Sequence, residues 1–340
     1  MDGFYSNNAT SSRNAHGSVL TIGRLVMLAV LATVALNVRA DDTGSNEANA
    51  ARFTGPLVSS SPPLPKGLWN IEPYLIQATT TGYYDNDGRH HHLRGQHSWR
   101  LAVPVMYGAT DRLSLGATLN PVHAGEPGGR DGFALGDTTL SALYLLADGA
   151  GEHSPKLTAA IRQNLDSGHH DRLDERRTSL VTGSGARTTT VAMYGQAYFL
   201  DRTLRGRVNV SGRLPYSGVS VRGPSAYGTD TGFNGRVDLG SAFEATVGVE
   251  YSLGPHWALA LDVVFESEQG ATITGQAVDT FGNTVAIEHR DPSSRRLSVA
   301  PAVEYHWNDN VGLIAGVFRS VSGRNAGDVF VPQVAVNVGF

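Results

Sequence analysis

The chain has 340 residues, with 27 Lys and Arg against 31 Asp and Glu and a net charge of −4. It contains no cysteine, which excludes a disulfide scaffold, thiolate metal sites and cysteine catalysis. The acidic balance argues against nucleic acid as a partner. Glycine is frequent, at 40 residues, as expected for a protein with many turns and closely spaced strands.

Residues 1–40 have the pattern of a cleaved signal peptide. Arg24 precedes the apolar run 25–36, and the small residue Ala40 follows at a suitable cleavage position. The run is too short to span a bilayer, which needs about 20 apolar residues. The sequence therefore predicts export through the inner membrane. The mature chain would have 24 Lys and Arg against 30 Asp and Glu, a net charge of −6. A translation start near Val19 is an alternative, because the segment before Arg24 is unusually long.

Residues 41–67 form a leader that turns from polar to rich in Gly, Ser and Pro. Proline stiffens a chain in an extended form and removes backbone donors, so this segment could fill a pore without adding a strand. Two interpretations are open: a flexible periplasmic leader, or a plug in the lumen of a barrel formed by residues 68–340. The plug candidates are Phe53, Thr54, Gly55, Pro56 and Leu57.

The rest of the chain repeats segments in which apolar and polar residues alternate. Most are near the nine to eleven residues that a tilted strand needs to cross a membrane, so we predict an all-β, antiparallel, up-and-down transmembrane barrel. Its twelve predicted strands are 68–80, 96–109, 113–121, 133–147, 156–166, 188–200, 204–214, 240–253, 257–268, 295–307, 311–321 and 328–340.

The predicted connections alternate between short and long. The short ones are tight turns such as 110–112 and 308–310; the long ones are 81–95, 122–132, 167–187, 215–239, 269–294 and 322–327. Bacterial outer-membrane barrels have short periplasmic turns and long extracellular loops. We therefore expect both termini on the periplasmic side and the long segments outside the cell.

Charged residues lie at the positions of these strands that face away from the apolar set. Facing lipid at the bilayer midplane, an Arg or Lys would cost roughly 2–4 kcal/mol, so these residues are predicted to line the lumen. They either create a transverse field that orients a polar solute or pair across adjacent strands. The lumen-lining candidates are Glu72, Arg100, Asp137, Arg162, Arg205, Arg207, Arg213, Glu244, Glu250, Asp262, Glu266 and Glu304.

The final segment 330–340 alternates from Phe330 to the terminal Phe340. A strand that ends on an aromatic fits the closing strand of an outer-membrane barrel, which shows lipid an apolar face. Phe340 resembles the signal read by the barrel-insertion machinery. Aromatic residues also gather beside the tight turns, as in the girdles of such barrels. These are Tyr107, Phe199, Tyr251, Trp257, Tyr305, Trp307 and Phe340.

The segments 53–57 and 64–75 resemble the opening of a family of outer-membrane transporters called MetA-pathway of phenol degradation. The segments 104–108, 135–139 and 304–310 match its style, so that the resemblance spans nearly all of the mature chain. The resemblance implies a pore or transporter-like barrel, sometimes linked to uptake of aromatic or other hydrophobic compounds.

The sequence thus predicts an outer-membrane channel for small solutes, with membrane lipid and the insertion machinery as its other partners and an oligomeric state left open. A surface barrel acting through its loops is the alternative, and an outer-membrane hydrolase a weaker one, because no nucleophile motif is found. No cofactor is predicted. The histidines 90–92 and 169–170 are interpreted as solvated loop residues rather than metal ligands.

Overall fold

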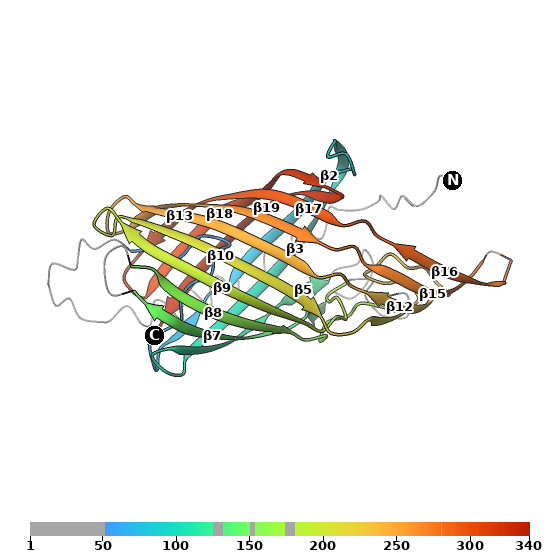
Figure 1. Ribbon diagram of the computed structural model, residues 1–340, viewed down its shortest axis with the longest axis horizontal. Coiled ribbons are helices and arrows are strands. Elements are labelled where there is room, and N and C mark those ends of the chain that lie inside the picture. The colour runs from blue at the N-terminus through green and yellow to red at the C-terminus, as the bar shows by residue number, and fades with distance from the viewer. Residues whose placement is uncertain (1–51, 125–131, 150–153, 174–180, 280) are drawn as a thin grey trace.

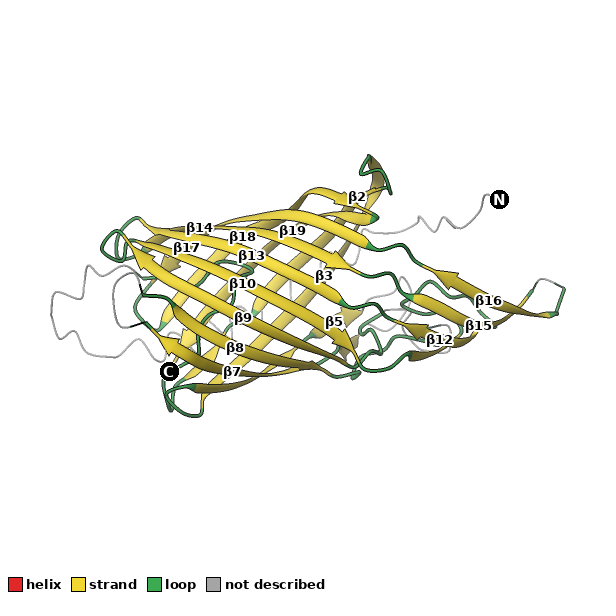
Figure 2. Cartoon of the chain, viewed as in Figure 1, coloured by secondary structure: helices red, strands yellow, loops and turns green. Residues whose placement is uncertain are grey.

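The computed structural model describes residues 52–124, 132–149, 154–173, 181–279 and 281–340. The described residues form strands and loops, and no helix among them is long and apolar enough to cross a membrane (Figure 2). The predicted signal peptide and the start of the leader lie outside these residues. The strands are β1 (Trp69–Ile71), β2 (Tyr74–Tyr84), β3 (His90–Gly108), β4 (Leu113–Leu119), β5 (Pro121–Ala124), β6 (Gly132–Leu135), β7 (Thr139–Asp148), β8 (Lys156–Asn164), β9 (Thr188–Phe199), β10 (Leu204–Pro215), β11 (Val219–Arg222), β12 (Asn234–Asp238), β13 (Ala242–Ser252), β14 (Trp257–Glu268), β15 (Thr272–Val278), β16 (Thr284–Arg290), β17 (Ser294–His306), β18 (Val311–Arg324) and β19 (Ala326–Gly339).

The main sheet closes on itself as a 12-stranded antiparallel barrel (Figure 1). β1 and β2 together make up the first strand of the barrel, because both pair with β3 and β19. The order around the barrel then runs β3, β4, β7, β8, β9, β10, β13, β14, β17, β18 and β19. The last strand pairs with both β1 and β2. At the closure, Trp69 and Phe340 exchange backbone hydrogen bonds of 2.8 and 3.0 Å. Closure leaves no unpaired sheet edge, which is what a strand in lipid requires.

Side chains alternate between a buried inner face and an exposed outer face. Along β14, Trp257, Leu259 and Leu261 are 51, 46 and 41% exposed, whereas Ala258 and Asp262 are fully buried. The outer face is therefore a continuous apolar belt, which in water would be a large exposed hydrophobic surface and in a membrane would face lipid. At one end of this belt Tyr305 contacts Trp257 and Trp307, with ring centroids 4.7 and 5.2 Å apart.

The two ends of the barrel differ. The turn end, at the left of Figure 1, carries short connections such as 200–203 and 307–310 together with the C-terminus. The loop end lies opposite. Two connections at the loop end are shorter than predicted: β2 and β3 extend to Tyr84 and from His90, and only Asn325 separates β18 from β19. The expected strict alternation of short and long connections was wrong there, because glycine and polar residues interrupt the alternating pattern although backbone pairing continues.

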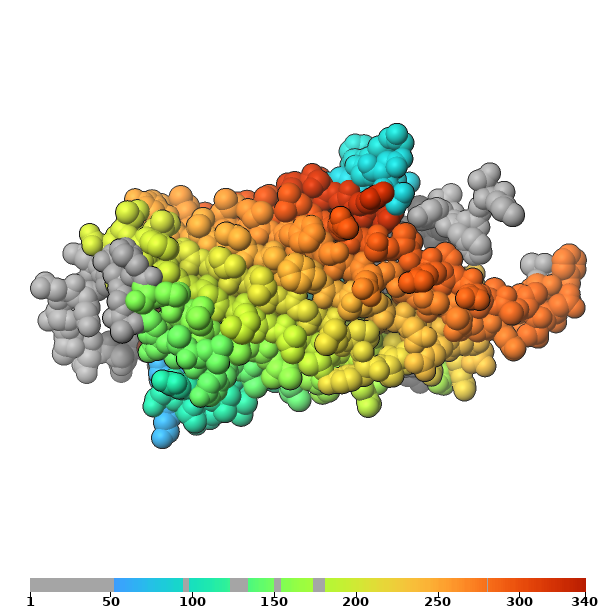
Figure 3. Space-filling model, in the orientation of Figure 1, coloured from blue at the N-terminus to red at the C-terminus, as the bar shows by residue number. Residues whose placement is uncertain are grey.

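The loop end also carries a second, four-stranded sheet that was not predicted. Its order is β11, β12, β15, β16, and it projects beyond the barrel as the yellow-to-orange extension in Figure 3. Val219, Val221, Phe233, Val237 and Ile273 form its apolar core, together with Ala186 from the connection before β9. The connections predicted as loops at 215–239 and 269–294 are thus largely paired. A separate hairpin, β5 with β6, takes the beginning of what was predicted as the fourth strand.

Candidate functional site

The leader runs inside the barrel. Its described part, residues 52–67, starts at the turn end, where Arg52 Nε donates to Asp309 Oδ1 over 2.5 Å. Further along, the backbone N–H of Thr54 donates to Glu304 (2.6 Å) and that of Val58 to Asp262 (2.8 Å). All these partners lie on β14, β17 or the turn after β17, so residues 52–58 of the leader follow one side of the inner wall.

The leader then crosses the lumen and returns to the turn end. Ser60 is held from two strands, because Arg162 Nη2 donates to its hydroxyl (2.6 Å) and Arg207 Nη1 to its carbonyl (2.7 Å). Leu64 N–H donates to Ser114 Oγ on β4 (2.8 Å), and Gly67 N–H to the Gly108 carbonyl on β3 (2.7 Å). The leader therefore makes polar contacts with opposite walls of the lumen, in the half of the barrel nearer the turn end.

A buried ionic cluster supports the middle of this path. Arg205 on β10 donates through Nε and Nη2 to the two oxygens of Glu250 on β13, at 2.6 and 2.5 Å. Arg207 Nε lies 3.2 Å from the same carboxylate, and its side chain is 1% exposed. The Arg205 guanidinium also lies 4.7 Å from the centroid of the Phe53 ring, within cation–π range. Glu250 therefore neutralises two arginines that hold the leader. Of the two predicted roles for these charges, pairing across adjacent strands is what Arg205 and Glu250 do.

Four glycines of the inner wall leave the space that the leader occupies. A Cβ added at Gly108 would lie 1.9 Å from the Pro65 carbonyl oxygen, and one at Gly248 would lie 2.7 Å from Ser59 Oγ. Added Cβ atoms at Gly312 and Gly316 would lie 2.7 Å from Thr54 Oγ1 and 2.5 Å from Leu57 Cδ1. These glycines come from β3, β13 and β18, so side chains are missing from the wall where the leader approaches it most closely.

Leu57 is the apolar anchor of the leader. Its side chain is buried in a recess of the inner wall, hereafter the alanine recess, whose members come from β14, β17, β18 and β19. Tyr74 and Phe318 pack against its margin. The members of the recess are Ala260, Ala300, Ala302, Ile314 and Ala335. The lumen of a water-filled barrel is ordinarily polar, so this patch is suited to an apolar group.

Charged side chains line the barrel between the leader and the loop end. Arg296 donates through Nε and Nη2 to both oxygens of Glu266, each over 2.8 Å, and Arg213 pairs with Glu268. Glu244 lies directly across from Glu266 on the neighbouring strand. A cavity of about 330 Å³ is bordered by these side chains and by Ser211 and residues 325–327.

The remaining predicted lumen residues fall in different places. Glu72 lies between β1 and β2 and accepts hydrogen bonds from Tyr74 and Asn337, at 2.6 and 2.9 Å. Arg100 is exposed on β3, opposite Ile76 of β2. Asp137 lies between β6 and β7, on no barrel strand. Its carboxylate accepts from Gly168 N–H (2.9 Å) and from the N–H and hydroxyl of Ser184. It therefore joins loop segments at the loop end and is not on the strand 133–147 in which it was predicted.

The histidines 90–92 lie on β3 rather than in a loop. His90 Nε2 is 2.9 Å from Asp328, and His91 Nε2 is 2.8 Å from Asp85. The hydrogen bond from His91 is the main reason that the pKa of the Asp85 carboxyl lies below its ordinary value. Within the described ranges, no group of three or more His, Asp or Glu side chains is arranged to hold a metal ion.

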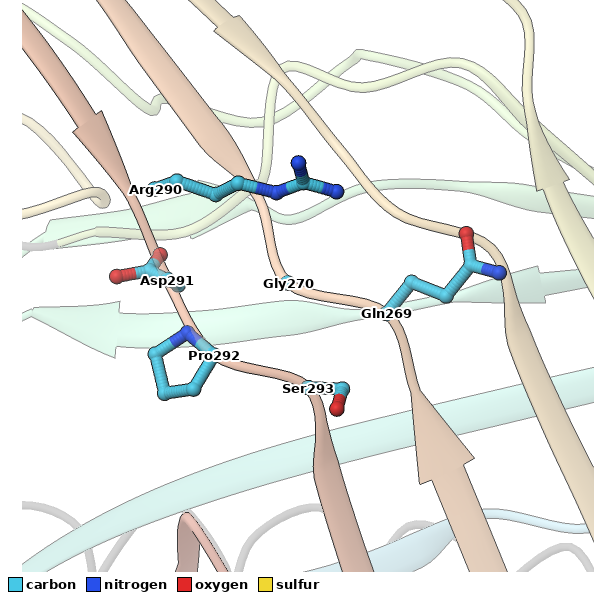
Figure 4. Close-up of a pocket in the computed structure, with 6 residues that line it drawn as sticks. All are labelled: Gln269, Gly270, Arg290, Asp291, Pro292 and Ser293. Atoms are coloured by element: carbon cyan, nitrogen blue, oxygen red, sulfur yellow. The ribbon is translucent and has the colours of Figure 1, made fainter. Parts of the chain in front are cut away.

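A further cavity of about 560 Å³ lies where β14 connects to β15 and β16 to β17 (Figure 4). Gln269 and Gly270 border one side, and residues 290–293 the other. The two connections run side by side, because a hydrogen bond of 2.8 Å joins Asp291 N–H to the Ala271 carbonyl. The cavity belongs to the junction between the barrel and the loop sheet, not to the lumen path.

Sequence reasoning missed the wall glycines, the alanine recess and the two serines of the leader, Ser59 and Ser60. Glycine and alanine in an alternating strand carry no functional signal of their own, because their role depends on which segment packs against them in the folded barrel. The one usable signal was that inward positions of β14, β17 and β18 are small where those of a wide, water-filled barrel are polar.

No family model matches the sequence, and a search of curated proteins returned no match. The resemblance to the phenol-degradation family therefore stays a prediction. The structure is similar to the crystal structure of an outer membrane channel from Pseudomonas putida F1, with a TM-score of 0.62 and 16% identity over 85% of this chain and 100% of that one. This similarity shows that the chain has the fold of an outer-membrane channel.

Two more distant similarities are to the NanC porin and to the Pseudomonas putida toluene transporter TodX. Their TM-scores are 0.42 and 0.40, with 9 and 10% identity. The first match covers 78% of this chain and 98% of the porin, and the second covers 86% of this chain and 94% of the transporter. Both are too remote to bear on the solute of this chain.

Proposed function

We propose that this protein is an outer-membrane channel for small solutes, and that its N-terminal leader closes the lumen at rest. The closed barrel with its apolar outer belt and the similarity to a solved outer-membrane channel support the first part. They favour a channel over a hydrolase, and the predicted export signal fits the same location. Small aromatic or other hydrophobic compounds are the solute class that the family resemblance suggests.

The observation that carries the plug is the match between leader and wall. Buried carboxylates Asp262 and Glu304 accept leader N–H groups, and the wall lacks side chains at Gly108, Gly248, Gly312 and Gly316 where the leader lies. A leader that only rested against the wall would not require these gaps. The leader is therefore a built part of the lumen in this state, and passage of solute requires it to move.

Planar-bilayer conductance tests the proposal. We would compare the mature protein with the same protein lacking residues 41–67, which removes the leader and leaves the barrel strands. A gated channel predicts little current from the full protein and stable current after the deletion, whereas stable current from both would exclude closure by the leader. Silence from both preparations, with correct folding shown by heat-modified gel mobility, would overturn the channel and favour a role for the projecting loop sheet.

A further inference from the structure

The alanine recess and Asp262 form one continuous surface. Asp262 on β14 is the cross-strand partner of Ala300 on β17, and Ala260 pairs with Ala302 in the next inward row. Gly316 on β18 continues that row beyond Ala302. An apolar depression and a buried, ionisable acceptor thus lie side by side on the same wall.

The leader fills both parts of this surface with three consecutive residues. The Leu57 side chain occupies the recess, while Val58 N–H and the Ser59 hydroxyl donate to the two Asp262 oxygens at 2.8 and 2.6 Å. Without the leader, the Asp262 carboxylate would lose both of these donors, and the recess would be an apolar hollow facing the lumen. Both losses are relieved by a molecule that brings an apolar group and a donor together.

We propose that this surface is a solute-binding site, and that the leader competes for it. The ligand class is a small molecule that joins a compact apolar body to a hydrogen-bond donor, either a hydroxyl or an ammonium group. The inference rests on the proposed function, since solute reaches the site only when the leader can withdraw. An anionic solute of the same size is rejected, because its charge would face the Asp262 carboxylate.

The site also explains how closure and passage are coupled. A solute that carries both features replaces the contacts of residues 57–59 and leaves the other leader contacts to break singly. A solute that lacks the apolar body or the donor gains less binding free energy at the site than the leader loses there, so the leader stays in place. The leader is then a selective barrier, because only a solute that reproduces the contacts of residues 57–59 displaces it.

Hydrogen exchange on the full mature chain tests the site. The probes are pentan-1-ol, pentylamine and pentanoate, which share an apolar body and differ in donor and charge. The alcohol and the amine should raise the exchange rates of the Val58 and Ser59 backbone amides up to a plateau as the probe concentration rises, while pentanoate should not. A response to only one of the two donors would identify the hydroxyl or the ammonium as the preferred group.

Two matched variants locate the effect. Leu57→Ala empties part of the recess, so the concentration of pentan-1-ol that gives half of the response should fall roughly tenfold. Leu64→Ala makes the same truncation in a leader residue outside the recess and should leave that concentration unchanged. No response to any probe, an equal response to pentanoate, or equal shifts in both variants would overturn the site.

These results are separable from the conductance experiment. A barrel that conducts nothing can still show competition between probe and leader, and a conducting barrel can fail to respond to every probe. Failure of the solute site therefore leaves the channel standing, while failure of the channel appears in the bilayer measurement alone.

Discussion

At the residue scale, Gly248 decides how closely the leader can approach β13. A Cβ at this position would lie 2.4 Å from Asp262 Oδ1 and 2.7 Å from Ser59 Oγ, and both atoms end movable side chains. Gly248→Ala should therefore turn Asp262 away and break its hydrogen bonds to residues 58 and 59, while the barrel stays folded. Hydrogen bonds to a charged group contribute about 1.5–3 kcal/mol each, so exchange of the Val58 amide should accelerate at least tenfold.

Gly212→Ala is the matched control for that change. A Cβ at Gly212 on β10 would have no atom within 4 Å, so the same addition should leave leader exchange unchanged. Equal acceleration in both variants would show that general loosening of the barrel, not loss of the Asp262 contacts, releases the leader.

Glu250 is the carboxylate that neutralises the two buried arginines, Arg205 and Arg207. It is fully buried and faces Arg205 and Arg207, so Glu250→Gln leaves two arginines without their carboxylate. Breaking a buried ion pair on one side costs about 3–5 kcal/mol, and the free energy of unfolding in lipid vesicles should fall by that amount. Glu268→Gln removes a half-exposed pair with Arg213 and should cost no more than about 1 kcal/mol. Similar losses in both variants would contradict the special position of Glu250.

At the element scale, the strands were predicted well and the loop sheet was not. Eight or more alternating residues identify a barrel strand such as β13 or β14, because every outward position must be apolar in lipid. β11 and β12 have only four and five residues and face no lipid, so the same pattern is too short to distinguish them from a polar loop. Their pairing follows from the packing of Val221 and Val237 in a shared core.

Tyr227 reports on the integrity of this loop sheet. Its side chain packs against the core of the sheet, and its hydroxyl donates to the Ser184 carbonyl over 2.5 Å. Burial, with the nearby charge of Asp137, raises the pKa of Tyr227 to about 12. Because the folded pKa exceeds the ordinary value of 10, the contribution of this phenol to stability is complete below pH 10 and is lost as pH rises towards 12.

An ultraviolet titration checks this expectation. The difference between the parent and Tyr227→Phe should show one phenol ionising near pH 12, and proteolysis of the loop sheet should accelerate in the same range only in the parent. A difference titration centred at pH 10 would show that Tyr227 is solvated and does not hold the sheet.

At the scale of the whole molecule, closure of the barrel brings Phe340 to Trp69. Their hydrogen bonds use backbone atoms, so Phe340→Ala keeps them and removes only the aromatic ring. If the ring is a signal for the insertion machinery, assembly into membranes containing that machinery should slow several-fold, while spontaneous refolding in detergent should be unchanged. Phe330→Ala, which removes an outward ring at the other end of β19, is the control. Equal slowing of both routes would show that the ring acts through packing alone.

The sequence alone predicted the all-β class, the strand periods and the division of charged and apolar residues between two faces. It did so because a strand in lipid must pair every backbone group and show an apolar outer face. These two requirements make apolar and polar residues alternate along each strand. The folded barrel was needed to see that residues 52–67 cross the lumen and that Leu57, Val58 and Ser59 contact the alanine recess and Asp262. Those contacts join residues far apart in the chain; Val58 and Asp262 are 204 positions apart. No local periodic pattern marks such partners. They depend on closure of the barrel, which brings distant inward positions to the same depth.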